Sequence, residues 1–224
     1  MKTLFTFLLF TIASFSQINY GLKAGMLTTI SKSTLTSFEV NTNIPTDPGI
    51  GFYLGGFLEK SINKSENLFF STGLQLKQVA MSFNSTTNNF IGISPIFGLV
   101  EVEQKTFASE IRISSLLIPF ILKYKPTEKF SFSGGMYAGY IANISTKYTD
   151  SNENYNGNNP DYSKSDFGLV IETSYEISPK LFIELKYEKG LNNLASQKEN
   201  AGFNSFSSDL RIQNFGIGLG YKLK

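Results

Sequence analysis

Charged side chains at alternating positions are the residues of this sequence that could do chemistry. They recur at every second position within stretches that are otherwise apolar or rich in glycine. The members of this set are Lys23, Glu59, Lys77, Lys123, Glu172, Glu184, Lys186 and Lys222. Alternate residues of a strand share one face, so these side chains lie opposite the large apolar ones. Because unpaired buried ions are costly, we expect them to form a structural network of salt bridges in a narrow interior. A proton or ion path through the same charges is the alternative.

Few residue types suited to catalysis are present. The chain has no histidine, so hydrolysis of the serine–histidine or aspartate–histidine kind lacks its base. Glu172 and Glu184 could form a carboxylate pair of the glycosidase kind, but charge pairing explains both more simply. Asp150, Glu153 and Asp161 could offer oxygen ligands to calcium, but their spacing favours a solvated loop. Phosphate-binding and nucleotide motifs are absent. We therefore predict no enzyme activity, no cofactor and no metal site.

Eight segments with a two-residue period must position these charges. They span residues 20–30, 50–61, 68–83, 106–125, 130–146, 166–177, 181–189 and 210–224. In the last one, large apolar residues from Phe215 to Leu223 alternate with glycine and lysine. An even number of such strands predicts an all-β fold, an eight-stranded antiparallel up-and-down transmembrane β-barrel. A secreted barrel of lipocalin type would point its apolar face inward, and the glycines on the opposite face argue against it.

The connections between these segments alternate between short and long. Those after the second, fourth and sixth segments are tight turns, and the others are long and polar. Outer-membrane barrels have short periplasmic turns and long outer loops, so this pattern places both termini in the periplasm. The outward aromatic residues also sort into two levels, as expected of two interfacial belts. The lower level holds Tyr20, Phe70, Tyr124, Phe130, Tyr175 and Tyr221, and the upper level holds Phe52, Tyr140, Phe167, Tyr187 and Phe215.

The N-terminal residues have the pattern of a secretory signal peptide. Lys2 provides the positive charge, residues 4–15 form the apolar core, and Ser14-Phe15-Ser16 resembles a cleavage site before Gln17. We therefore expect a signal peptide over 1–16, Sec-type export, and a barrel domain over 17–224. The absence of cysteine excludes a disulfide framework and a lipoprotein anchor. With 20 basic and 18 acidic residues and no basic block, binding of nucleic acid is not indicated.

One predicted outer loop is unusually apolar. Residues 90–100 include Phe90, Ile91, Ile96 and Phe97, and exposed apolar surface often marks a partner site. We therefore consider these four residues a candidate contact for other envelope proteins. A loop that folds over its own barrel mouth is the alternative.

Several short motifs resemble one family. They are Tyr20-Gly-Leu-Lys-Ala-Gly-Met26, Leu117-Ile-Pro-Phe-Ile-Leu-Lys-Tyr124, Gly134-Gly-Met-Tyr-Ala-Gly-Tyr140, Asp166-Phe-Gly-Leu-Val170, Tyr187-Glu-Lys-Gly-Leu-Asn-Asn193 and Gly216-Ile-Gly-Leu-Gly-Tyr221. In this order they resemble the PorT-type outer-membrane β-barrel family of Bacteroidota, over nearly the whole chain after residue 17. The end Leu223-Lys224 departs from the aromatic residue with which many members finish. The resemblance implies an eight-stranded barrel in an outer membrane, and its namesake takes part in protein secretion.

Taken together, these features predict an integral outer-membrane barrel with a structural or protein-interaction role. An accessory role in envelope protein secretion or assembly is the finer expectation. The alternative is a narrow channel or a barrel that binds a small ligand. Conductance would distinguish the two, because a lumen filled by paired charges conducts little.

Overall fold

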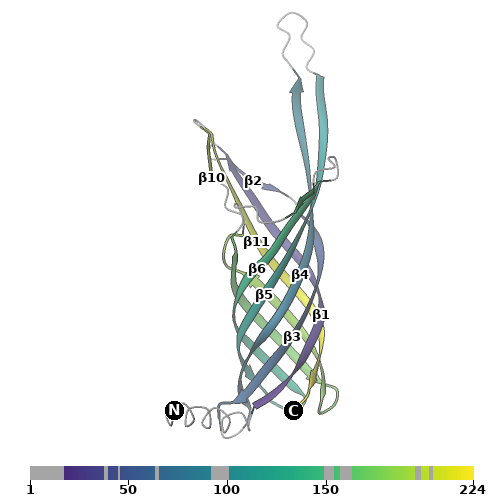
Figure 1. Cartoon of the computed structure of the whole chain (residues 1–224), viewed down its shortest axis with the longest axis vertical. Coiled ribbons are helices and arrows are strands. Elements are labelled where there is room, and N and C mark those ends of the chain that lie inside the picture. Colours follow the sequence, from purple (N-terminus) through teal and green to yellow (C-terminus); the bar gives the residue numbers. More distant parts are fainter. Residues whose placement is uncertain are drawn as a thin grey trace, which may run out of the picture.

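The strands of this chain close into a barrel (Figure 1). The computed structural model describes residues 18–37, 40–44, 46–63, 66–91, 101–148, 154–156, 163–194, 198–201 and 204–224. Eight antiparallel strands form the wall. They are β1 (Ile18–Ser37), β3 (Thr46–Ser61), β4 (Leu68–Ile91), β5 (Glu101–Tyr124), β6 (Phe130–Tyr148), β8 (Ser165–Glu176), β9 (Leu181–Gly190) and β11 (Asn204–Lys222). Because β1 pairs with both β3 and β11, the sheet has no open edge along the wall, and the predicted fold class is confirmed. Among these residues there is no helix of the length and apolarity needed to cross a membrane.

Alternation along each strand separates an outer face from an interior. On β3, Phe52, Leu54 and Leu58 are exposed, whereas Tyr53 and Phe57 between them are buried. β8 and β9 show the same two-residue period of burial. This is the reverse of a soluble barrel, in which the apolar face points inward. We call the end at which β1 begins and β11 finishes the lower end; it is at the bottom of Figure 1.

Tight turns join the strands at the lower end. Side chains satisfy their backbone groups, as is common for Asn, Ser and Thr. The Asn63 side chain accepts a hydrogen bond from the Leu68 amide at 3.1 Å. Thr127 accepts one from the Phe130 amide, and Ser178 accepts one from the Leu181 amide, each at 3.1 Å.

The strands are longer at the upper end than the sequence pattern predicted. β1 continues to Ser37 rather than ending at residue 30, and β11 begins at Asn204 rather than near 210. Three further short strands lie within the predicted loops. β2 (Val40–Ile44) pairs with β1, β7 (Asn154–Asn156) with β6, and β10 (Lys198–Ala201) with β11. Strands with polar residues on both faces lack a two-residue period, so the pattern could not show these extensions.

β4 and β5 extend furthest and rise above the rest of the wall as a two-stranded ribbon (Figure 1). They remain paired up to Ile91 and Glu101. The register of β3 with β4 ends at Thr46 and Phe83, and that of β5 with β6 ends at Ser109 and Tyr148. Within the described residues, the ribbon above this level therefore pairs only with itself.

Candidate functional site

Ion pairs fill the middle of the barrel interior. The Lys23 Nζ atom lies 3.1 Å from Glu172 Oε1 and 3.4 Å from Glu184 Oε2. Lys186 Nζ lies 3.1 Å from the same Glu172 oxygen and 3.4 Å from Glu188 Oε1. All five side chains are buried. They come from β1, β8 and β9, so strands far apart in the sequence are joined through the lumen.

A second group continues this network toward the upper end. Lys77 Nζ is 3.0 Å from Glu188 and 3.7 Å from Asp166. The Asn214 amide donates to Glu188 at 3.1 Å and accepts a hydrogen bond from the Thr29 hydroxyl at 2.9 Å. Glu188 therefore has three partners, Lys77, Lys186 and Asn214, which compensate for its removal from water.

Two tyrosines complete the central layer. The Tyr53 hydroxyl donates to Glu184 at 2.5 Å, and the Tyr137 hydroxyl donates to Asp166 at 3.2 Å. Lys186 Nζ also lies 4.5 Å from the centre of the Tyr53 ring, a cation–π contact. The tyrosine rings fill space between the ion pairs, and their hydroxyl groups also donate hydrogen bonds to the carboxylates.

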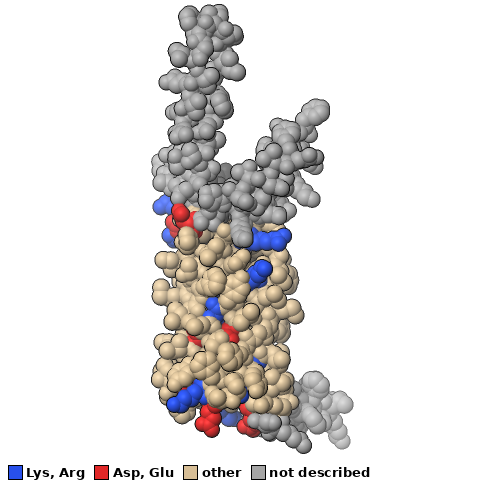
Figure 2. All heavy atoms as spheres, turned by 180° about the vertical axis from the view of Figure 1, so that it is seen from behind, with Lys and Arg blue, Asp and Glu red and all other residues tan. Residues whose placement is uncertain are grey.

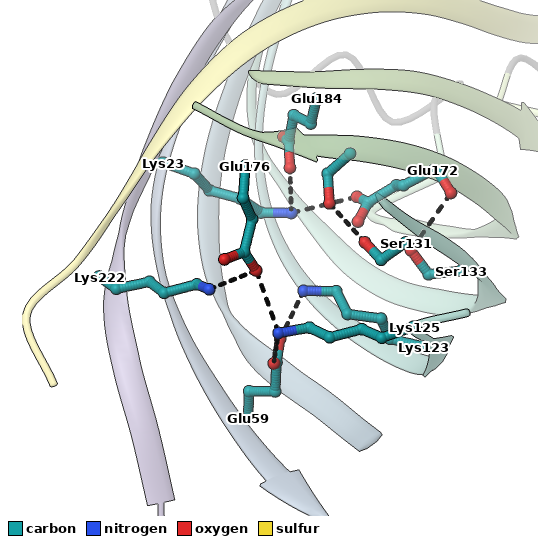
Figure 3. A network of polar contacts seen from close by, with 11 residues as sticks. Lys23, Glu59, Lys123, Lys125, Ser131, Ser133, Glu172, Glu176, Glu184 and Lys222 are labelled. Carbon is teal, nitrogen blue, oxygen red and sulfur yellow. Dashed lines mark hydrogen bonds and ion pairs between the residues drawn. The ribbon is translucent and has the colours of Figure 1, made fainter. Parts of the chain in front are cut away.

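A separate network lies at the lower end (Figure 3). Glu59 pairs with Lys123 and, at 3.6 Å, with Lys125. Glu176 lies 3.1 Å from Lys125 and 2.5 Å from Lys222. The side chains of Lys125, Glu176 and Lys222 keep 16–19% of their surface exposed, so this network faces the lower opening.

An aromatic layer lies between the two networks. The rings of Phe57 and Phe182 meet edge to face, with centroids 5.8 Å apart. Along β9 the buried residues follow in the order Phe182, Glu184, Lys186 and Glu188. The interior is therefore layered from the lower network through phenylalanine to the central network.

Lysines and carboxylates of the lumen are equal in number within the described residues. The lysines are Lys23, Lys77, Lys123, Lys125, Lys186 and Lys222, and the carboxylates are Glu59, Asp166, Glu172, Glu176, Glu184 and Glu188. Each of them has at least one partner of opposite charge. The interior is thus close to neutral, which is the condition for retaining charges out of water.

The eight charged residues predicted from the sequence all project into the lumen, but they belong to two networks. Lys23, Lys77, Glu172, Glu184 and Lys186 lie in the central network, and the other three lie in the lower one. The predicted set did not contain Lys125, Asp166, Glu176 and Glu188. Their positions have the same parity as Lys123, Gly168 and Lys186 on their strands, so the two-residue period contained the signal.

An apolar layer above the ions was not predicted. It consists of Leu27, Tyr53, Val79, Met81, Ile111, Ile113, Ile141, Ile144, Leu194, Leu210 and Ile212. At this level the exposed neighbours are polar: Arg112 lies between Ile111 and Ile113, and Arg211 lies between Leu210 and Ile212. The polarity of the two faces is therefore inverted relative to the lower part of the wall.

Glycines of β11 make room for the lumen aromatics. A Cβ atom on Gly218 would lie 2.0 Å from the Tyr53 hydroxyl oxygen, and one on Gly220 would lie 2.0 Å from the Phe182 ring. Both distances are far below van der Waals contact. The interior is thus packed so closely that only glycine fits at these two positions.

The outer face is a continuous apolar band with aromatic residues at both margins. The predicted belt residues Tyr20, Phe70 and Tyr124 are exposed near the lower end, and Phe52 and Phe215 are exposed higher up. Figure 2 shows mainly uncharged atoms over this band, with a few blue and red atoms among them. Residues 13–196 match the model of a family described as the outer membrane protein beta-barrel domain. The chain belongs to this family. For an outer-membrane barrel, the exposed apolar band is the surface that contacts lipid.

Three solved structures are similar to this chain in their strand arrangement. Neisserial surface protein A is 10% identical, with 90% of this chain and 96% of that chain covered and a TM-score of 0.46. The attachment invasion locus protein Ail of Yersinia pestis is 11% identical, with 92% and 99% covered and a TM-score of 0.40. OprG of Pseudomonas aeruginosa is 16% identical, with 92% and 95% covered and a TM-score of 0.41. No curated protein matched the chain.

Other predicted positions lie wholly or partly outside the described part of the barrel. Phe90 and Ile91 are paired in β4 with Val102 and Glu101. The other predicted positions lie outside the described residues. They are Ile96 and Phe97, the acidic group Asp150, Glu153 and Asp161, and the signal peptide over 1–16.

The possible carboxylate pair Glu172 and Glu184 is bound by one shared lysine, Lys23. Within the described ranges, no group of His, Cys, Asp and Glu could hold a metal ion.

Proposed function

We propose that this outer-membrane barrel is a non-conducting, non-enzymatic scaffold that anchors or contacts other envelope proteins. In this proposal the signal peptide over 1–16 directs Sec-type export, and both termini are periplasmic. The lower end then faces the periplasm, and the β4–β5 ribbon faces the outside. The tight turns at the lower end and the long connections at the upper end support this orientation.

The observation that carries the proposal is the filled lumen. The layer of Phe57 and Phe182, the central ion pairs and the apolar layer that includes Leu27 and Ile212 follow one another along the axis. An eight-stranded barrel has an interior just wide enough for side chains to fill. A narrow channel or ligand-binding barrel would need a continuous polar passage, which these layers disfavour.

The partner side of the proposal follows from the outer ribbon and the motifs in the sequence. The resemblance to the PorT-type family of Bacteroidota supports an accessory role in secretion or assembly across the envelope. Our candidate contact for a partner is the apolar set Phe90, Ile91, Ile96 and Phe97. Phe90 and Ile91 end β4, and Ile96 and Phe97 lie in the sequence between β4 and β5. Without histidine, and with the lumen carboxylates paired, catalysis has little support.

Conductance in planar bilayers tests the filled lumen. We expect the refolded barrel to insert without stable open-channel steps over the voltage range in which a porin control conducts. Insertion is checked in the same samples by the mobility shift of folded barrels on unheated gels. Large, stable single-channel currents from folded protein would contradict the proposal and favour the channel alternative.

Crosslinking in native membranes tests the partner role. The double substitution Ile96→Ser with Phe97→Ser should weaken recovery of crosslinked envelope proteins, whereas Ile50→Ser with Leu76→Ser, on the lipid-facing wall, should not change which proteins are recovered. Unchanged crosslinking by the loop variant would remove these residues from the proposed contact.

A further inference from the structure

The upper margin of the lipid-facing band carries exposed basic residues on two adjacent strands, β9 and β11. Exposed Lys189 on β9 lies opposite Gln213 on β11. Exposed Arg211, two residues from Gln213, is therefore diagonal to Lys189, about 7–8 Å away between Cα atoms. In the register of β11 with β1, the partner of Arg211 is another basic residue, Lys32. Lys189 and Arg211 define what we call the cation patch.

The cation patch lies directly beyond an aromatic pair. Tyr187 and Phe215 are register partners on β9 and β11, and their ring centroids are 4.7 Å apart. Lys189 follows Tyr187 by two positions and Arg211 precedes Phe215 by four, which is about 7 Å and 13 Å along the strands. The Tyr187 hydroxyl donates to Gln213 at 3.2 Å, between the two levels. Aromatic belts lie at the headgroup level of a bilayer, so the cations lie at or just above the headgroups.

No ion pair compensates the charge of the patch within the part of the barrel that the structure describes. Among the outward-facing residues of β9, β11 and β1 whose side chains are described, none is acidic. Within the described residues, neither Lys189 nor Arg211 forms an ion pair, whereas Arg112 on the β5 side is 2.6 Å from Glu110. The patch is therefore a local source of positive potential at the membrane surface.

We infer that Lys189 and Arg211 bind phosphate groups of lipid headgroups in the leaflet at the upper end of the barrel. An arginine and a lysine are suited to phosphate, the first through paired N–H donors and the second as a point charge. Tyr187 and Phe215 below them provide an apolar and aromatic surface for the acyl and sugar part of the same lipid. This combination favours a phosphorylated glycolipid over free phosphate. The inference rests on the proposed orientation, in which this leaflet is the outer one.

Lipid retention by the full chain tests this site. The barrel is refolded in phosphatidylcholine nanodiscs containing bisphosphorylated lipid A or the same lipid without phosphates, and bound lipid is counted by native mass spectrometry. We expect preferential retention of the phosphorylated form. Lys189→Gln with Arg211→Gln should weaken this retention by about tenfold or more, because each basic residue near an anionic surface adds to the attraction. Lys189→Arg with Arg211→Lys should retain it.

The matched control removes the same charge at the other margin. Lys60 and Lys129 are exposed near the lower end, and Lys60→Gln with Lys129→Gln should leave retention unchanged. Equal loss in both double variants, equal retention of the unphosphorylated lipid, or equally strong competition by inorganic phosphate would overturn the inference. Conductance measured on the same folded samples reports separately on the scaffold proposal, because closing of the lumen does not depend on Lys189 or Arg211.

Discussion

At the scale of single residues, the charged side chains of the lumen are compensated only when all of their partners are present. Glu172 is shared by Lys23 and Lys186, and Lys23 is shared by Glu172 and Glu184. Removing one member of a buried network leaves the remaining charges uncompensated, which costs more than the network contributes relative to apolar packing. These residues therefore behave as a set.

Replacing Lys23 by Met should destabilise the barrel by about 3–5 kcal/mol, because Glu184 would lose its only lysine partner within the described residues and Glu172 one of two. Urea unfolding in lipid vesicles, followed by tyrosine fluorescence, measures the change. Lys60→Met on the exposed outer face is the control and should change the free energy of unfolding by about 0.5 kcal/mol or less. A similar small change for both variants would contradict the role assigned to Lys23.

Replacing Gly218 by Ala should cost about 1–3 kcal/mol, because its Cβ would meet the Tyr53 hydroxyl and force the ring out of place. Gly56 offers the matched control, since a Cβ there finds its nearest neighbour at 3.7 Å. Gly56→Ala should be neutral or slightly stabilising. The unfolding midpoints of the two variants, compared in the same vesicles, distinguish a steric clash at Gly218 from the low strand propensity of alanine.

At the scale of elements, β8 and β9 reach less far up the wall than their neighbours, since β8 begins at Ser165 and β9 ends at Gly190. Residues 191–194, which follow β9, close the wall at this level. Asn192 accepts a hydrogen bond from the Phe167 amide at 2.9 Å and donates to the Ser165 carbonyl oxygen at 2.5 Å. Asn193 accepts one from the Leu210 amide at 2.7 Å. Leu194 then inserts into the apolar layer. The Gly-Leu-Asn-Asn motif thus replaces strand pairing with side-chain hydrogen bonds.

Asn192→Ala should open the upper end of β8, because two backbone groups lose their partners at a cost of about 1–3 kcal/mol. Hydrogen exchange read by mass spectrometry should show faster exchange in peptides covering residues 165–170. Asn143→Ala, at an exposed position of β6, should leave exchange there unchanged. Equal protection of β8 in the two variants would show that the asparagine bonds do not hold this edge.

The β4–β5 ribbon should be separable from the barrel. Replacing residues 84–108 by an Asn-Gly turn keeps the Phe83–Ser109 pair and uses a sequence suited to a two-residue hairpin. Because the removed part pairs only with itself within the described residues, the free energy of unfolding should change by about 0.5 kcal/mol or less. Recovery of envelope partners should fall. A large loss of stability would show that the ribbon supports the wall and is not only a presenting element.

At the scale of the whole molecule, closing the lumen requires volume more than charge. Replacing four of the central ions together by apolar residues of similar size tests this: Lys23→Met, Glu172→Leu, Glu184→Leu and Lys186→Met, with Tyr53→Phe to avoid an unpaired hydroxyl. Lys77, Glu188 and Asp166 still pair with one another in this variant. Such replacements of buried ion networks are often neutral or stabilising by about 1–4 kcal/mol. We expect a folded barrel that still shows no channel steps in planar bilayers. Conductance or failure to fold would mean that the charges have a role that packing cannot supply.

The sequence alone determined the class of the barrel and which face meets lipid. Eight segments with a two-residue period, tight turns after every second one and belts such as Tyr20 and Phe215 are local patterns, and each can be read from residues close together in the chain. The same two-residue period placed Lys23, Glu172 and Glu184 on the inward face of their strands. The partners of these charges could not be read in the same way.

Only the tertiary structure decided those partners and the layers of the lumen. Lys23 and Glu184 are 161 positions apart, and their distance depends on the closure of β11 on β1 and on the stagger of every strand between. The upper apolar layer shows the same limit. Ile111 and Ile212 share the parity of the inward residues Lys123 and Asn214, but at their level the outer face is polar, as at Arg112 and Arg211, so hydrophobicity alone does not show there which face meets lipid. Local alternation separates two faces, and the closed barrel shows how far up the wall the apolar outer band extends.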